Sequence, residues 1–322
     1  MPPQHVTTCW VVTDGKAGME SQCLGLAEAL GITPQIKRLQ PRFPWSHLPP
    51  QLWALPLCGL SPSGDRLAPP WPDLLIATGR ATVAPALAIK RQSPSTVVVQ
   101  IQNPRAGAAR FDLIIAPAHD RMTGPNILET TGALHRVTAK RLAEAAEAFR
   151  GRFASLPRPL IGVLIGGANR QYRMSAANAD RLGALLAAAA ETSGGGLAIT
   201  PSRRTGAENL KRITAPLAGS ATDIWDGTGE NPYFGILALA DALIVTSDSV
   251  NMVTEACATG KPVHVFDLEG GSAKFSRFHE ALRRKGMTRP FTGDLGDPGD
   301  RTHTPPDDMA RAAAAVRALL TR

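Results

Sequence analysis

The segment TSDSVNMVTEA, late in the chain, carries residue types that suit the binding of a nucleotide diphosphate. Ser247, Asp248 and Ser249 precede a helical pattern, where their side chains can cap the helix while its free N–H groups face an anion. Asn251 falls in the first turn, and Glu255 lies roughly 6–9 Å along the helix axis from the start. We therefore predict a diphosphate at the helix end and Glu255 on a ribose hydroxyl. The alternative is an ordinary N-cap at Ser249 and a solvated helix face at Glu255.

Two earlier segments of the same half have similar chemistry. IGGAN places two glycines after a predicted strand, where backbone N–H groups can approach a phosphate; a plain tight turn is the alternative. SRRTG places two guanidinium groups between a predicted strand and a predicted helix, which suits bidentate phosphate contacts; a solvated basic loop is the alternative. The residues of these turns that we predict to bind a nucleotide are Gly166, Gly167, Asn169, Ser202, Arg203 and Arg204.

The first half offers candidates for acid–base chemistry. Asp14 and Lys16 in TDGKAG put a carboxylate and an ammonium group at a strand end, which suits a base and an anion clamp; an Asx-turn with a surface lysine is the alternative. His119 in PAHD is a second candidate base, although a loop histidine is more often polar surface. Other residues near predicted strand ends in this half are candidates for an acceptor side: Gly18, Arg80, Asn103 and Arg105.

Several classes of site are disfavoured by the sequence. It contains neither the G-x-G-x-x-G fingerprint of dinucleotide-binding proteins nor the G-x-x-x-x-G-K-[ST] phosphate loop. The histidines and the four scattered cysteines show no metal-ligand spacing, so we expect no metal and no cofactor. A formal net charge of +8 without a dense basic tail makes nucleic acid a weak candidate partner. Phosphorylated small molecules or an anionic membrane face fit this mild basic bias better.

The expected location is cytoplasmic. The amino-terminal sequence MPPQHVTTCWVV lacks the charged and apolar regions of a secretory signal, and no apolar run approaches the roughly 20 residues of a membrane span. Peripheral attachment to the inner face of the membrane is a further option, which rests on the Pro-rich stretch from Phe43 to Trp71. Its three tryptophans and several leucines suit a lid or a membrane-interface contact, whereas a loop packed on its own domain is the alternative.

Predicted strands and helices alternate along the whole chain. Strands are expected at TTCWVVTD, LLIATG, TVVVQIQ and FDLIIAP, and then at PLIGVLIGG, GLAITPS, ALIVT and PVHVF. Because parallel strands end at one edge of a sheet, each half should carry one polar rim. The predicted fold class is α/β, with two Rossmann-like domains whose parallel sheets face each other across a cleft. The predicted domains are residues 1–156 and 157–322; in a variant of this division the last helix packs back on the N-terminal domain.

Motifs in both halves resemble those of the ELM-type mitochondrial-fission family, whose bacterial members often carry the label nucleoside-diphosphate-sugar epimerase. The similarity runs from about Trp10 to about Phe291. The motifs that carry it are VTDGKAGMESQCLGLAEALG, QIQNPR, LETTGALHRV, IGGANRQYRMS, ITPSRRTG, ENPYFGILALADALIVTSDSVNMVTEACATGKPVHVF and KFSRFHEAL.

The second half also looks like the donor domain of GT-B glycosyltransferases, in which a Gly-rich turn and a later strand–helix turn with an internal Glu hold a nucleotide sugar. DGKAG in the first half is unlike the Gly-rich, His-bearing loop of the lipid-linked-sugar transferases. The resemblance implies a nucleotide diphosphate and ribose surrounded by Gly167, Asn169, Ser202, Arg203, Ser249, Asn251 and Glu255.

The favoured function is metal-independent transfer of a sugar from a nucleotide-diphosphate sugar to an envelope or lipid-linked acceptor. A nucleotide-sugar epimerase with the same two-domain build is the first alternative. A binding or recruitment protein that keeps the scaffold without turnover is the second, because a fold does not decide among such functions.

Overall fold

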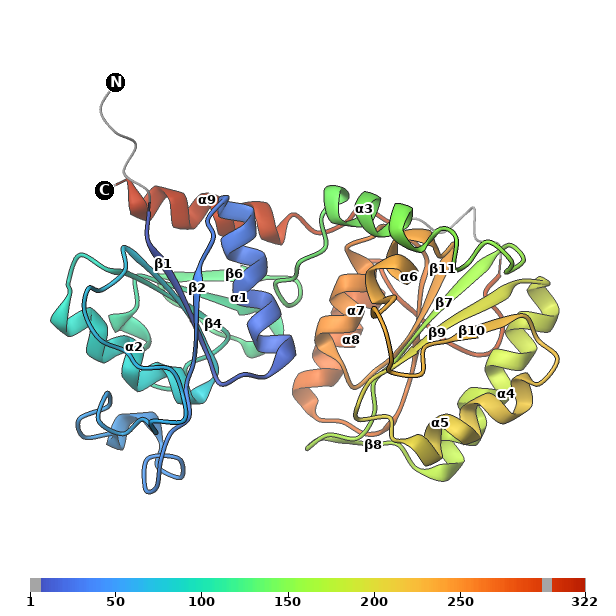
Figure 1. Cartoon of the computed structure of the whole chain (residues 1–322), viewed down its shortest axis with the longest axis horizontal. Helices are drawn as coiled ribbons and strands as arrows, with labels where there is room; N and C mark the ends of the chain where they lie inside the picture. Colours follow the sequence, from blue (N-terminus) through green and yellow to red (C-terminus); the bar gives the residue numbers. More distant parts are fainter. Residues whose placement is uncertain (1–6, 297–302, 322) are drawn as a thin grey trace. The chain divides into compact units, whose positions relative to one another are not determined.

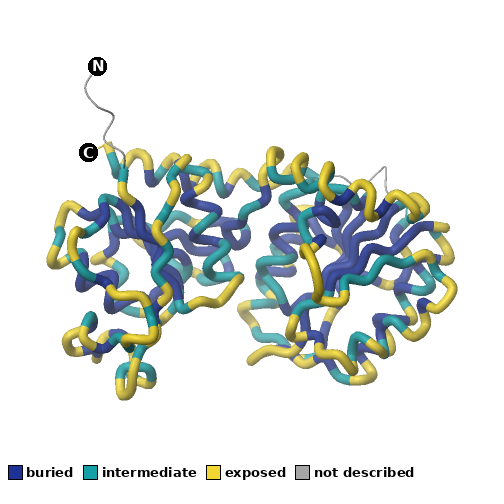
Figure 2. The backbone as a smooth tube through the Cα atoms, in the orientation of Figure 1, coloured by how far each residue is buried: buried dark blue, intermediate teal, exposed yellow. Residues whose placement is uncertain are grey.

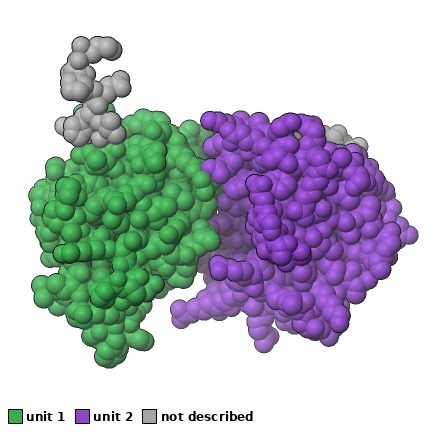
Figure 3. Space-filling view, viewed as in Figure 1, with its two compact units in different colours: residues 1–136, 307–322 green, residues 137–306 purple. Residues whose placement is uncertain are grey.

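The chain divides into two compact units (Figure 3). A computed structural model describes residues 7–296 and 303–321, so the first six residues of the amino-terminal segment lie outside it. Unit 1 comprises Met1–Arg136 together with Asp307–Arg322, and unit 2 comprises Val137–Pro306. This division differs from the predicted boundary after residue 156, because residues 137–156 group with unit 2. The last helix groups with unit 1, as in the variant of the prediction.

Unit 1 is built on a six-stranded parallel sheet with the order β2-β1-β3-β4-β5-β6 (Figure 1). The strands are β1 (Cys9–Thr13), β2 (Gln35–Arg38), β3 (Leu74–Thr78), β4 (Val97–Ile101), β5 (Leu113–Pro117) and β6 (Ile127–Thr130). The helices are α1 (Ala17–Leu30), α2 (Arg80–Gln92) and α9 (Asp308–Leu320), with 3-10 turns η1 (Pro50–Leu52), η2 (Ala108–Arg110) and η3 (Ala118–Asp120).

Both faces of this sheet are covered, which explains why its strands read as continuous apolar runs. Successive side chains of a strand point to opposite faces. Val11 of β1 therefore joins the cluster beneath α1 and α9, whereas Val12 joins the cluster on the α2 side. Figure 2 shows the resulting buried strands inside helices whose outer surfaces are exposed.

Unit 2 repeats the plan with a six-stranded parallel sheet in the order β10-β9-β7-β11-β12-β14, plus a short antiparallel pair, β13-β8. The sheet strands are β7 (Leu160–Ile165), β9 (Gly196–Pro201), β10 (Thr222–Ile224), β11 (Ala242–Thr246), β12 (Val263–Phe266) and β14 (Arg289–Pro290), and the pair is β8 (Tyr172–Arg173) with β13 (Glu269–Gly270). The helices are α3 (Ala139–Phe149), α4 (Ala176–Ser193), α5 (Ala207–Thr214), α6 (Tyr233–Leu239), α7 (Val250–Cys257) and α8 (Ala273–Arg284), with the 3-10 turn η4 (Ala215–Leu217).

The core of unit 2 also has two layers. One packs α4 and α5 on the sheet through residues such as Leu182 and Ile213. The other packs α3, α6, α7 and α8 through Phe149, Val253 and Phe278. The prediction of two Rossmann-like parallel sheets is therefore confirmed.

Strand order reverses at one place in each sheet. In unit 1 the chain runs outward from β1 to β2 and then returns to β3 on the other side, and in unit 2 it runs from β7 through β9 to β10 and then returns to β11. Ligands of open α/β sheets bind beyond the carboxyl ends of the strands at such a reversal. In this protein the reversals lie at the β1/β3 edge and the β7/β11 edge.

The Pro-rich stretch lacks strands, as predicted, and packs on unit 1. The indole N–H of Trp45 donates to the carbonyl of Ala54 at 2.8 Å, and that of Trp53 donates to the carbonyl of Leu48 at 3.1 Å. Trp53 is buried, and Trp71 contacts Trp10 edge-on. These tryptophans hold the stretch together.

Candidate functional site

Three turns meet at the carboxyl edge of the unit 2 sheet. They follow β9, β7 and β11, which are neighbours in the sheet, so the turn residues predicted from separate segments lie in one place. The turns contain Ser202, Arg203 and Arg204; Gly166, Gly167 and Asn169; and Ser247, Asp248 and Ser249.

The carboxylate of Asp248 ties these turns together. Its side chain is completely buried, and its Oδ2 lies 2.7 Å from an Nη atom of Arg204, whose side chain is 38% exposed. The N–H of Gly167 donates to the same oxygen at 3.1 Å, and the hydroxyl of Thr246 donates to Oδ1 at 2.7 Å. A buried carboxylate needs this number of partners, because desolvation is otherwise strongly unfavourable.

The two glycines of the β7 turn serve this packing. A Cβ on Gly166 would lie 2.2 Å from Oδ1 of Asp248, and one on Gly167 would lie 2.2 Å from the carbonyl oxygen of Arg204. The N–H of Gly166 donates to Thr246 at 2.7 Å. Since both glycine N–H groups already have protein acceptors, they are not the phosphate donors that the sequence suggested.

Asn169 and Ser202 are also engaged with the turns. The amide of Asn169 donates to the carbonyl of Asp248 at 3.2 Å, and its oxygen accepts from the N–H of Gln171 at 2.8 Å. The hydroxyl of Ser202 donates to the carbonyl of Gly166 at 2.9 Å. These residues therefore shape the edge, and the charge available to a ligand comes from other side chains.

Two arginines provide that charge. Arg203 and Arg170 are exposed, and neither guanidinium group has an ion pair or hydrogen bond with the residues that the structure describes. Nearby, α7 begins at Val250, and Ser249 caps it by accepting the N–H of Met252 at 3.3 Å. A helix N-terminus beside unpaired arginines favours an anion.

Glu255 occupies a different environment from either prediction. It is buried on α7, and the hydroxyl of Tyr233 from α6 donates to its carboxylate. Burial raises the pKa of Tyr233 well above its ordinary value, and the charge of Glu255 raises this pKa further. Glu255 is thus part of an internal pair and not of a solvated helix face.

A pocket of about 270 Å³ opens beside the β11 turn, between the β8–β13 pair and α8. It is lined by Tyr172, Ser247, Asp267, Leu268, Gly270, Gly271, Ser276, His279, Glu280 and Arg283. The lining is mostly hydroxyl and charged groups, including an ion pair between Asp267 and Arg283 at 3.3 Å. Such a lining suits a ligand with several hydroxyl groups.

His279 lines this pocket, and its hydrogen bond defines the tautomer of its ring. Its ring is 5% exposed, and Nε2 lies 2.9 Å from the carbonyl oxygen of Ser247. Because a carbonyl only accepts, Nε2 carries the proton and Nδ1 keeps a lone pair. Nδ1 is buried and has no partner among the described residues. Burial lowers the pKa of His279, more strongly than the bond to Ser247 raises it, which keeps the ring neutral near neutral pH.

The carboxyl edge of the unit 1 sheet is more open. Asp14 follows β1 and pairs with Lys16, whose side chain is 70% exposed. Gly79 follows β3, and its Cβ position lies 3.8 Å from the Asp14 carboxylate. His119 is buried after β5. Two strands, β3 and β4, separate it from β1, so about 14 Å lies between the two strand ends. The three predicted catalytic residues therefore do not form one cluster.

The predicted acceptor-side residues lie around this edge in separate roles. Gly18 is in the first turn of α1, and Arg80 begins α2 and donates to the carbonyl of Ser46 at 2.6 Å. Asn103 accepts the N–H of Arg105 at 2.7 Å in a turn where Arg105 has a φ of 61°. Arg105 is exposed.

Sequence reasoning missed the residues that complete the unit 2 site. Thr246 ends a predicted strand, and Asp267 follows another, so strand ends alone would have found both. Tyr172 and His279 come from β8 and α8, which give no such signal. No group of three or more His, Cys, Asp or Glu suited to a metal occurs within residues 7–296 and 303–321. Over the same residues, every helix is too short or too polar to cross a membrane.

The chain is similar in sequence to one described protein family. Residues 17–320 match the model of the family described as mitochondrial fission ELM1. The mitochondrial fission protein ELM1 of Arabidopsis thaliana is 36% identical over 271 residues, which are 76% of this chain and 63% of the plant protein. The chain thus spans less than two thirds of that relative.

Solved structures with the same fold have much lower identity. UDP-GlcNAc 2-epimerase of Neisseria meningitidis, bound to UDP-GlcNAc, matches with a TM-score of 0.58 and 14% identity, covering 98% of this chain and 100% of that one. MurG of Acinetobacter baumannii matches with a TM-score of 0.50 and 15% identity, covering 98% and 92%. At this identity the likeness establishes the GT-B fold and nothing finer.

Proposed function

The chain belongs to the mitochondrial fission ELM1 family, and we propose that it is a GT-B enzyme that takes its sugar from a nucleotide-diphosphate sugar. Unit 2 would bind this donor, and unit 1 would carry the acceptor-side residues. The acceptor would be an envelope or lipid-linked hydroxyl compound.

The observation that carries the proposal is the pocket beside the β11 turn, whose wall is mostly hydroxyl and charged groups. Such groups can hydrogen-bond the hydroxyl groups of a sugar. The pocket lies on the same sheet edge as Arg203 and the N-terminus of α7. An elongated ligand with a sugar at one end and a diphosphate beside it fits this distribution of groups.

The chemistry would place positive charge where negative charge develops. In transfer, the bond from the anomeric carbon to the diphosphate breaks with its electron pair on the leaving oxygen, and a bond to the acceptor oxygen forms. Arg203, Arg170 and the N-terminus of α7 would stabilise the leaving diphosphate. The acceptor proton would pass to a base, for which Asp14 is the candidate because it follows β1 at the unit 1 strand reversal.

Calorimetric titration with UDP, GDP and inorganic pyrophosphate tests donor binding. Arg203→Gln removes a charge-assisted contact and should weaken binding of the preferred nucleotide by about 1.5–3 kcal/mol. Arg66→Gln is the matched control, because Arg66 is an exposed arginine of unit 1 outside the candidate site, and it should leave nucleotide affinity unchanged. Undetectable binding of all three ligands to the wild type would contradict the donor site and favour a recruitment protein.

Product analysis distinguishes the two enzymatic readings. We expect incubation with a panel of UDP- and GDP-sugars and an acceptor extract to release free nucleoside diphosphate together with a glycosylated acceptor. An isomerised sugar still attached to its nucleotide would instead identify an epimerase. The second candidate function, epimerisation, is supported by the fold that the chain shares with the UDP-GlcNAc 2-epimerase of Neisseria meningitidis.

A further inference from the structure

The Pro-rich part of unit 1 from residue 41 to residue 64, here called the insert, exposes apolar side chains to an unusual degree. Phe43, Leu52 and Leu55 are 79%, 62% and 73% exposed, and they are all the exposed large hydrophobic residues of the described chain. Single exposed apolar residues are common in proteins, but three on one short segment mark a contact surface.

This exposure does not come from a loosely packed loop. Besides the two tryptophan N–H bonds described above, Arg80 of α2 donates to the carbonyl of Ser46, and Gly59 packs against the ring of Trp45. Leu55 has a φ of 47°, a left-handed conformation that is unfavourable for a branched side chain. The carbonyl of Leu55 accepts the N–H of Cys58 at 2.9 Å, so the fold holds this exposed leucine in a defined turn.

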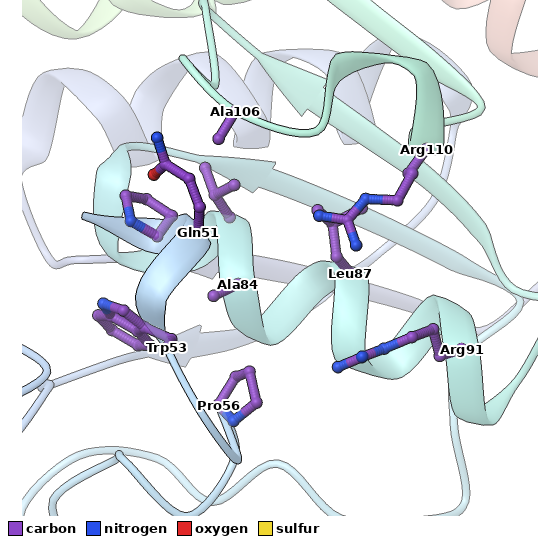
Figure 4. Close-up of a pocket in the computed structure, with 10 residues that line it drawn as sticks. Gln51, Trp53, Pro56, Ala84, Leu87, Arg91, Ala106 and Arg110 are labelled. Atoms are coloured by element: carbon purple, nitrogen blue, oxygen red, sulfur yellow. The ribbon is translucent and has the colours of Figure 1, made fainter. Parts of the chain in front are cut away.

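A small cavity lies between the insert and α2 (Figure 4). Its volume is about 110 Å³, and Trp53, Pro56 and Leu87 form much of its apolar wall. Arg91 and Arg110 stand at one side, with the guanidinium group of Arg110 near Leu87 in the close-up. Neither arginine has an ion pair or a side-chain hydrogen bond with any residue that the structure describes.

The surrounding chain is basic. Residues 40–64 and 74–111, which include the insert, α2 and the loop after β4, contain six Lys or Arg residues and no Asp or Glu. Asp112, which follows the second segment, forms an ion pair with Lys90 at 2.8 Å, and the other five cations have no ion pair with a described residue. An anionic partner would thus meet a net positive charge.

We propose that this face of unit 1 binds the surface of an anionic phospholipid bilayer. Leu52 and Leu55 enter the interfacial layer, and Arg91 and Arg110 hold a lipid phosphate at the cavity between the insert and α2. The combination fits a membrane because it joins apolar tips, which favour the interface, to unpaired arginines, which favour anionic headgroups. A soluble phosphorylated ligand would use the arginines but would leave the exposed leucines unexplained.

Co-sedimentation of the full chain with vesicles tests the proposal. We expect binding to phosphatidylcholine vesicles that contain phosphatidylglycerol, weak binding to pure phosphatidylcholine, and release by salt. Arg91→Gln with Arg110→Gln should lower the partition coefficient about tenfold or more. Leu52→Ser with Leu55→Ser should lower it about tenfold. Because all four side chains lie at the surface, circular dichroism and the thermal midpoint should stay as in the wild type.

The matched control for charge is Lys140→Gln on α3 with Arg150→Gln at its C-cap in unit 2, which also removes two positive charges. This variant should bind vesicles as the wild type does. Three results would overturn the proposal: no sedimentation of the wild type with anionic vesicles, equal losses in the control, or leucine variants that bind normally. A dimer that dissociates in the leucine variants would assign the face to a second copy of the chain and would overturn it as well. The nucleotide titrations do not depend on any of these results.

Discussion

The carboxyl edges of the two sheets differ although the sheets share one plan. In unit 2 the turns after β7, β9 and β11 are bonded to one another through the buried carboxylate of Asp248. In unit 1 the corresponding carboxylate, Asp14, pairs with an exposed lysine, and the other polar residues are separated along the edge. A ligand of unit 2 would find a preorganised site, whereas a ligand of unit 1 would have to order its own contacts.

The largest expected difference between the two edges is the loss of stability when the carboxylate of Asp248 or of Asp14 is removed. Asp248→Ala leaves Arg204 and a buried N–H without their acceptor and should destabilise unit 2 by about 3 kcal/mol. Asp14→Ala removes an ion pair with an exposed lysine and should change stability by at most about 1 kcal/mol. Hydrogen exchange resolved by mass spectrometry would report each unit separately. Similar losses of stability in both variants would contradict the proposed difference between the two sheet edges.

The stability of unit 2 should depend on pH through His279, which has no counterpart in the prediction for unit 1. Burial lowers the pKa of His279 in the folded state below its ordinary value of 6.5. Below about pH 6.5 the unfolded chain takes up a proton that the folded pocket resists, so stability present at pH 7 is lost as the pH falls, at no more than about 1.4 kcal/mol per pH unit. His279→Gln should reduce the difference in urea midpoint between pH 7 and pH 5. An unchanged difference would remove His279 from the explanation.

The smallest expected effect concerns helix caps. Helices α1 and α2 of unit 1 begin without a side-chain cap bond, whereas Ser249 caps α7 in unit 2. Ser249→Ala should weaken nucleotide binding by about 1 kcal/mol, because the hydroxyl is lost but the helix N–H groups remain. Ser175→Ala removes the cap of α4 and should lower the stability of the protein as much as Ser249→Ala does. It should leave nucleotide affinity unchanged. Calorimetric titration of both variants would measure the difference.

The sequence predicted the sheets well because their strands are buried on both faces and read as apolar runs. The start of α1 is harder to predict, because the polar residues of GKAGMESQ are typical of a loop although the helix begins at Ala17. The strands β6 and β14 could not be predicted, because their exposed residues interrupt the apolar pattern. Short edge strands carry little of the core and so leave little trace in the sequence.

The site could be predicted in position but not in detail. Strand ends placed the nucleotide candidates on one edge, since that follows from parallel topology alone. Which donors remain for a ligand depends on partners far away in sequence, such as Asp248 for the N–H of Gly167. His279 shows the same limit, because the state of its ring depends on the carbonyl of Ser247, 32 residues earlier.

Helix α9 has a consequence for how the chain is made. Its Ala312, Ala313 and Val316 belong to the same core cluster as Val11 of β1, and Asp308 accepts the N–H of Thr131 at 2.7 Å. All of unit 2 separates these partners in the chain. A ribosome must therefore translate the complete second unit before the first can close its core. The first unit to emerge is the last to be finished, and until then the apolar residues that α9 covers stay open to solvent.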